Sequence, residues 1–293
     1  MAQSKSFFGL RRGSTKTLTF SVYNGKQVTK DRVADVKNPR SSAQMKQRAI
    51  MATALHGYSA LKEICDHSFE GVTYGQKSMN YFVAENARMI RSAAPKVNLS
   101  LFKGNSVSNA YIISKGSLPS IEVKSVVTDG SIRQFQIPMA NGDSVTFGKV
   151  MSSLGATLAG DMVTFVFLKD NPGGNASIYW VRLKLSDENK GKTMAQGDNI
   201  LENMTEGTDF ETNIDNFTPN DLSLLTMETY LAPEITGSSQ VPQSLGVIMS
   251  RKADAAWLRS SSTMVNLFDT FNYTEALATY PENGERILNG GNM

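Results

Sequence analysis

Cysteine, histidine and long apolar runs are scarce in this chain of 293 residues, and each shortage excludes a class of protein. A single cysteine, Cys65, excludes an internal disulfide and fits a reducing compartment. With only two histidines, His56 and His67, the chain offers too few ligands for a structural zinc site, and we expect no metal and no cofactor. No apolar run approaches the roughly 18 residues of a membrane-spanning helix.

Motifs of the common enzyme classes are also missing. The stretch GLRRGSTK at 9–16 lacks Walker spacing, and a predicted hairpin follows it instead of a helix. The chain contains no G-x-S-x-G, H-E-x-x-H or Gly-rich dinucleotide turn. Asp and Glu are abundant, but no pair is marked by its context as an acid/base couple. We therefore expect a protein that is not an enzyme.

The opening residues, MAQSKSFFGLRRG, lack the continuous apolar core of a signal peptide. Together with the single cysteine, this predicts a protein made in a bacterial cytoplasm. It would stay there or belong to a virion released by lysis, and it would not be secreted through a signal peptide.

Charge is distributed unevenly along the chain, although the net charge is only +3. Residues 1–100 hold 16 Lys and Arg against six Asp and Glu, a net of +10. Residues 101–200 hold ten against eight, a net of +2, and residues 201–293 hold four against 13, a net of −9. Such polarity indicates partners: nucleic acid for the basic part, or the acidic end of another copy. A chance gradient of solvated surfaces is the remaining alternative.

The first hundred residues combine a hairpin with two predicted helices. Alternating residues on both sides of Asn24-Gly25 predict a β-hairpin over 17–33, since this pair favours a two-residue turn. In NPRSSAQMKQRAIMA at 38–52, Ser41 and Gln44 form a capping box. Apolar residues three and four apart then predict a helix with a wide buried stripe over 42–65. A second helix is expected from a cap at Ser78 to about residue 91.

From residue 98 onward the apolar period changes from about 3.6 to 2, which predicts short strands separated by turns. We expect one helical turn near 149–154, an acidic, Gly/Asn/Thr-rich long excursion or linker over 187–222, and a hairpin that turns at 253–255. The predicted fold is therefore α+β, with an antiparallel sandwich or barrel-like domain behind the hairpin and helices. Three parts are expected: a basic part at 1–97, the β domain at 98–190, and an acidic hairpin region with its tail at 191–293.

Basic residues of the first third are the candidates for contact with nucleic-acid phosphates, without preference for base sequence. They are Arg11, Arg12, Lys26, Lys30, Arg32, Arg40, Lys46 and Arg48. For Arg40, Lys46 and Arg48 a solvated helix face explains the charges equally well. Phe135, Tyr179 and Trp180 could stack on bases, but core packing is the favoured interpretation for each.

Apolar residues near both ends of the chain are the candidates for contacts between copies, because terminal segments seldom become ordered alone. They are Phe7, Phe8, Tyr280, Ile287 and Leu288. The expected partners are other copies of this chain and other virion proteins, with nucleic acid bound through its phosphates.

Three motifs resemble a family of uncharacterised proteins from gut bacteria and their phages. NPRSSAQMKQR at 38–48 is similar to the family signature N-P-R-[ST]-x-A-Q-x-x-Q-R. The basic opening GLRRGST with YNGKQVTKDRV, and YIISKGSLP at 111–119, are similar as well. The likeness covers about residues 9–170. It implies a β-sandwich-like domain behind a helical pair, and a protein associated with phages or prophages. It implies no activity and no active-site residues.

Two functional hypotheses follow. The first is a non-enzymatic structural protein of a phage or virus-like particle, such as a coat, head-completion or tail component, that assembles with itself. The second is a nucleic-acid-binding accessory protein of a phage or mobile element. The first explains both charged ends, whereas the second leaves the acidic third without a role.

Overall fold

The computed structural model describes eleven stretches of the chain, and every structural statement below concerns these residues: 2–4, 12–23, 26–32, 42–93, 110–128, 132–140, 144–170, 176–195, 198–214, 244–254 and 256–266. Two compact units are present, Met1–Ser41 and Ser42–Met293, and each is described by itself. The expected three-part division at residues 97 and 190 stays a prediction.

The first unit is a four-stranded antiparallel sheet in the order β1-β4-β3-β2. Its strands are β1 (Ala2–Ser4), β2 (Gly13–Ser14), β3 (Leu18–Tyr23) and β4 (Lys26–Asp31). Tyr23 pairs with Lys26, which leaves a two-residue loop between the strands. This confirms the hairpin that Asn24-Gly25 predicts, although the two turn residues lie outside the described residues.

The second unit begins with helix α1 (Ser42–Ser68), which extends the predicted 42–65 helix by one turn. Its cap candidate Ser41 lies outside the described residues. The buried stripe is narrower than expected, because Met51 and Leu55 are 38% and 40% exposed and His56 is also exposed. The buried apolar side chains are those of Ile50, Ala54, Tyr58, Leu61, Ile64 and Cys65.

Helix α2 (Gln76–Ala93) starts two residues before the predicted cap, so the assignment of Ser78 as N-cap was wrong. Gly75 precedes the helix at φ +79°, a conformation that favours glycine, and its carbonyl accepts from the Met79 amide at 3.0 Å. Ser78 is 1% exposed, and its hydroxyl donates to the Cys65 carbonyl at 2.6 Å. The serine therefore joins the two helices.

A six-stranded antiparallel sheet is the centre of the second unit, in the order β12-β10-β9-β13-β14, with β16 also pairing with β13. Its strands are β9 (Met162–Asp170), β10 (Ala176–Lys184), β12 (Phe210–Thr212), β13 (Ser244–Ala253), β14 (Ala256–Arg259) and β16 (Val265–Asn266). The β13–β14 pair confirms the predicted hairpin, in which Asp254 has φ +47°.

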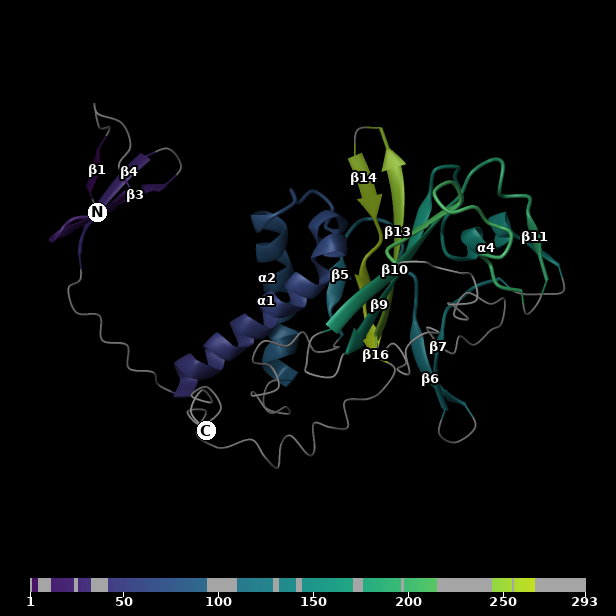
Figure 1. Ribbon diagram of the computed structural model, residues 1–293, viewed down its shortest axis with the longest axis horizontal. Helices are drawn as coiled ribbons and strands as arrows, with labels where there is room; N and C mark the ends of the chain where they lie inside the picture. Colours follow the sequence, from purple (N-terminus) through teal and green to yellow (C-terminus); the bar gives the residue numbers. More distant parts are fainter. Residues whose placement is uncertain are drawn as a thin grey trace. The chain divides into compact units, whose positions relative to one another are not determined.

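Both faces of this sheet are covered, because alternate residues of each strand point to opposite sides. Val166 and Leu168 pack with Leu61 and Phe82 of the helices, whereas Val163 and Phe165 belong to a second core with helix α4 (Phe147–Ser153). Figure 1 shows α1 and α2 on one side of β9, β10 and β13, and α4 on the other. Helix α4 confirms the predicted helical turn, two residues earlier than expected.

Smaller strand pairs complete the second unit. They are β5 (Ile112–Ser114) with β15 (Ser262–Thr263), β6 (Lys124–Thr128) with β7 (Ile132–Gln136), and β8 (Val145–Thr146) with β11 (Thr193–Met194). The expected order of hairpin, two helices and antiparallel β domain is therefore confirmed, and the fold is α+β with mostly β structure.

Of the two interpretations of 187–222, a long excursion or a linker, the linker was wrong for the described part, residues 187–195 and 198–214. Ile200, Leu201 and Phe210 are buried in the core of the sheet, and β12 pairs with β10. Acidic and glycine-rich composition suggested a linker because only a few apolar anchors are spaced among many polar residues. Those anchors hold the segment against the body of the unit.

Candidate functional site

The first unit presents a basic face, formed by Lys26, Lys30 and Arg32. Side chains two residues apart on a strand share a face, so Lys26 and Lys30 project from the same side of β4. The Arg32 amide donates to the Thr17 carbonyl at 2.7 Å, which continues the ladder by one residue. All three cations are exposed, whereas Gln27 on the opposite face is 3% exposed.

An aromatic ring stands on this basic face. Tyr23 pairs directly with Lys26 across the hairpin and is 71% exposed. Opposite residues of an antiparallel pair share a face, so the two side chains project from the same side of the hairpin. Exposed rings beside cations are typical of surfaces that bind single-stranded nucleic acid.

The structure places only some of the other predicted cations. Arg12 is exposed just before β2, and Arg48 is exposed on α1 of the second unit. Lys46 also belongs to α1, while Arg11 and Arg40 lie outside the described residues. The eight candidates therefore divide between the two units, and three of them share one face.

The residues predicted for contact between copies all lie outside the described residues. They are Phe7, Phe8, Tyr280, Ile287 and Leu288. Their role in assembly stays a prediction.

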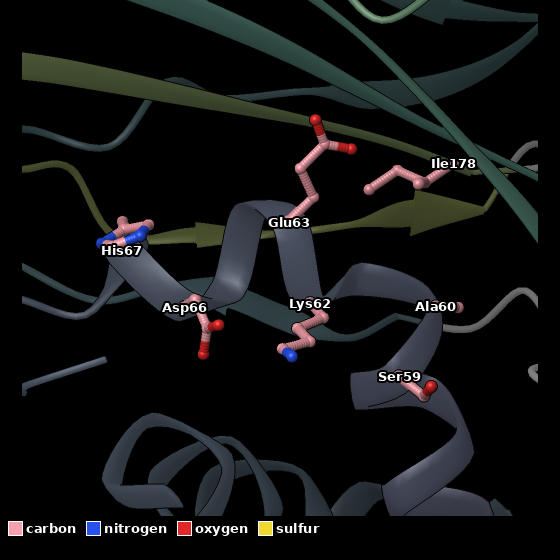
Figure 2. A pocket seen from close by; sticks show the side chains of 7 residues that line it. All are labelled: Ser59, Ala60, Lys62, Glu63, Asp66, His67 and Ile178. Atoms are coloured by element: carbon pink, nitrogen blue, oxygen red, sulfur yellow. The ribbon is translucent and has the colours of Figure 1, made fainter. Parts of the chain in front are cut away.

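A hollow of about 630 Å³ lies beside α1 and is lined by Ser59, Ala60, Lys62, Glu63, Asp66, His67 and Ile178. Its titratable groups do not converge, since Figure 2 shows Glu63 beside Ile178 while Lys62 and Asp66 point to the opposite side. The Asp66 carboxylate accepts from the Tyr58 hydroxyl and from the Gly75 amide, so it holds the helix connection in place. This arrangement offers no acid/base couple.

A second hollow, of about 430 Å³, is lined by Glu70, Gly71, Tyr81, Lys115, Gly116 and Ser117. Glu70 accepts from the Ser117 amide at 2.9 Å and from the Arg259 amide at 3.2 Å. The Ser117 amide is the main cause that lowers the pKa of Glu70 below its ordinary value. Glu70 therefore ties together three segments that are distant in the sequence.

Within the stretches that the structure describes, no group of three or more His, Cys, Asp or Glu side chains could hold a metal. His56 and His67 are exposed, and Cys65 is fully buried. Burial raises the pKa of the Cys65 thiol well above its ordinary value, which makes it a poor nucleophile.

One face of the central sheet carries a pattern that the sequence reasoning missed. The motif Trp-x-Arg occurs at Trp180-x-Arg182 in β10 and again at Trp257-x-Arg259 in β14. In each, the guanidinium carbon lies 5.0 Å from the centre of the indole ring. These two tryptophans are the only ones in the chain. The repeated motif within predicted strands was a signal that could have identified them.

The three aromatic residues considered for base stacking have different places. Phe135 is fully buried in the core, and Tyr179 packs against that core on the other face of the sheet. Trp180 lies on the face with the arginines and packs in part against the helices. Core packing is thus confirmed for Phe135.

Comparison with protein families, with curated proteins and with solved structures finds no match for this chain. Among the helices that the structure describes, none is long and apolar enough to cross a membrane.

Proposed function

We propose that the protein is a non-enzymatic structural component of a phage or virus-like particle that assembles with copies of itself. It would be a coat, head-completion or tail component, with its basic N-terminal part turned toward nucleic acid. One observation carries the proposal: the compact unit Met1–Ser41 holds nine Lys and Arg against two Asp, a net charge of +7.

A unit this small with this charge repels itself and gains from a polyanion that supplies countercharge. Lys26, Lys30 and Arg32 concentrate part of the charge on one exposed face, where phosphates can reach it. Contact with phosphates releases counterions and gives affinity that does not depend on base sequence.

Self-assembly is supported by the opposite charge at the other end of the chain, where residues 201–293 carry a net of −9. Attraction between unlike ends of two copies is a heterologous contact, which closes into a ring or shell or continues as a filament. Exposed pairs contribute only about 0.2–1 kcal/mol each, so charge would set the register while buried apolar area supplies the affinity.

The second candidate is a nucleic-acid-binding accessory protein, which Tyr23 favours. A tyrosine that is 71% exposed beside Lys26 can stack on an unpaired base. The resemblance to phage-associated proteins at 38–48 fits either candidate.

Sizing chromatography with multi-angle light scattering tests assembly. The full chain at high concentration and moderate salt is expected to form rings, shells or filaments that dissociate as salt rises. A monomer or dimer under those conditions would favour the accessory protein.

The basic face is tested with the double variant Lys26→Gln/Lys30→Gln and a single-stranded oligonucleotide. Removal of two phosphate contacts should reduce the slope of log affinity against log salt by about 1.4. Lys149→Gln/Lys190→Gln is the matched control, because it removes the same charge from exposed positions of the second unit. Equal effects of the two double variants would exclude a dedicated face.

A further inference from the structure

The two Trp-x-Arg motifs lie on the same face of the central sheet, which we call the Arg–Trp face (Trp180, Arg182, Trp257 and Arg259). Arg182 pairs with Thr164, and Thr164 pairs with Ile248 of β13. Ser250, two residues further along β13, pairs with Arg259. Paired residues share a face, as do residues two apart on a strand, so both motifs point to the side of α1.

More cations lie on this face. Lys184 follows Arg182 by two residues, and Lys252 pairs with Trp257. Only four Lys and Arg occur in the acidic segment 201–293, and three of them lie on the β13–β14 hairpin. Lys252 and Arg259 are on this face, whereas Arg251 is on the opposite face and pairs with Asp161. The hairpin is therefore a basic island in the most acidic third of the chain.

Within the part of the chain that the structure describes, the carboxylates of Glu211 and Glu70 lie near these cations, and Glu70 accepts from the Arg259 amide at 3.2 Å. Glu211 of β12 pairs with Arg182 at 3.2 Å and with Lys184. Arg259 has no described carboxylate within 4.0 Å of its guanidinium, which donates to the His67 carbonyl at 3.2 Å. Burial and the nearby charge of Arg182 lower the pKa of Arg259 below its ordinary value, and the charge of Glu70 opposes them only in part. A guanidinium in this setting favours an anion as its partner.

Planar groups are exposed beside the charge. Trp257 is 40% exposed, and the Arg259 guanidinium lies over its ring. Indole and guanidinium planes both stack on unpaired bases, whereas bases inside a duplex are already stacked on each other. An acidic peptide would use the charges but would leave the planes without a role.

We propose that the Arg–Trp face binds single-stranded nucleic acid, with phosphates held by Arg259 and Lys252 and a base stacked on Trp257. The site belongs to the second unit alone. It is therefore independent of the basic face in the first unit and holds whether or not that face binds nucleic acid.

Tryptophan fluorescence tests the proposal directly, because both tryptophans of the chain belong to the site. The full chain is titrated with a single-stranded oligothymidine while indole emission and the anisotropy of a labelled oligonucleotide are recorded. We expect saturable quenching of the emission, at oligonucleotide concentrations where anisotropy also rises, and weaker binding as salt rises.

Some variants should weaken binding of the oligonucleotide, and one should strengthen it. Trp257→Ala is expected to weaken binding about fivefold or more, with Trp180 as the remaining reporter. Arg259→Gln and Lys252→Gln should each reduce the salt slope by about 0.7. Glu211→Gln removes one of the competing carboxylates and should tighten binding. Lys149→Gln, on the opposite side of the sheet, is the charge-matched control and should change neither quantity beyond the effect of net charge.

Three results would overturn the proposal. Anisotropy that rises without quenching would place binding on the first unit, and the proposed function would stand without the Arg–Trp face. Equal quenching by polyglutamate would identify an acidic protein as the partner. Quenching that Arg259→Gln, Lys252→Gln and Glu211→Gln all leave unchanged would show that these charges do not form the site.

Discussion

At the scale of single residues, the second unit is held by carboxylates that are ionised because the fold supplies their partners. Burial alone would raise the pKa of Asp161, but hydrogen bonds from Arg251 and from the Leu158 and Thr157 amides outweigh it and lower the pKa. Arg251 binds both carboxylate oxygens, at 2.8 and 2.6 Å. The pKa of Asp209 is lowered in the same way: burial would raise it, but hydrogen bonds from Lys192, the Thr205 amide and Asn189 outweigh burial.

Asp161→Asn should lower the free energy of unfolding by on the order of 3 kcal/mol at pH 7, because Arg251 loses its anion at a site where Asp161 is 1% exposed. A carboxylate with a lowered pKa stabilises the fold above its unfolded pKa, about 4, and this stability is lost as pH falls through the folded value. The difference between wild type and variant should therefore shrink below about pH 4. Urea unfolding at a series of pH values measures it.

The control for this comparison is Asp187→Asn. Asp187 pairs with Lys190, but both side chains are largely exposed, at 75% and 59%, so the pair should contribute little. The prediction fails if Asp161→Asn lowers the free energy of unfolding no more than Asp187→Asn does, or if the loss does not depend on pH. Either result would show that the buried Asp161–Arg251 pair contributes little to stability.

At the scale of elements, Gly57 explains how α1 approaches the strand region. A Cβ atom at Gly57 would lie 3.0 Å from the ring of Tyr111, which is fully buried just before β5. The glycine weakens the helix locally, by about 1 kcal/mol relative to alanine, but it allows this close contact. Helix propensity and packing therefore act against each other at one position.

At Gly57 we expect the cost of displacing Tyr111 to exceed the gain in helix propensity. Gly57→Ala would gain about 1 kcal/mol in helix propensity, but displacing a buried ring costs about 1–3 kcal/mol, so the urea midpoint should fall or stay level. Ala60→Gly, in the next turn and half-buried, reports the propensity cost alone and should lose about 1 kcal/mol. A clear rise in the midpoint of Gly57→Ala would mean that Tyr111 can move aside at little cost.

At the scale of the whole molecule, two units of unlike charge share one chain. The second unit buries two cores, one on each face of its central sheet, and Figure 1 shows helices on both sides of that sheet. A body with its own cores needs no terminal segments to stay folded.

Truncation tests this view. Deletion of residues 1–12 or of residues 274–293 should leave the second unit folded but give a smaller species in light scattering, because each deletion removes candidate apolar contacts. Phe7 and Phe8 are lost in the first case, and Tyr280, Ile287 and Leu288 in the second. A large assembly that survives both deletions would assign self-association to other surfaces. Far-UV circular dichroism confirms that each truncated chain is folded.

The sequence by itself determined the features that depend on neighbouring residues. Asn24-Gly25 predicted the hairpin, apolar spacing predicted α1 and α2, and alternation predicted the strands of an α+β fold. The excess of cations in the first third could also be read from the sequence. These features were predictable because turn preference and periodicity act over a few residues.

Tertiary structure alone decided which side chains meet across the chain. It placed Ser78 under the Cys65 carbonyl instead of at a helix cap, and it drew Phe210 into the core from a segment that resembled a linker. It also brought Trp180 and Trp257, 77 positions apart in the sequence, onto one face of a sheet. The physical reason is strand pairing: register decides which distant residues are neighbours, and it is fixed by the packing of the whole sheet.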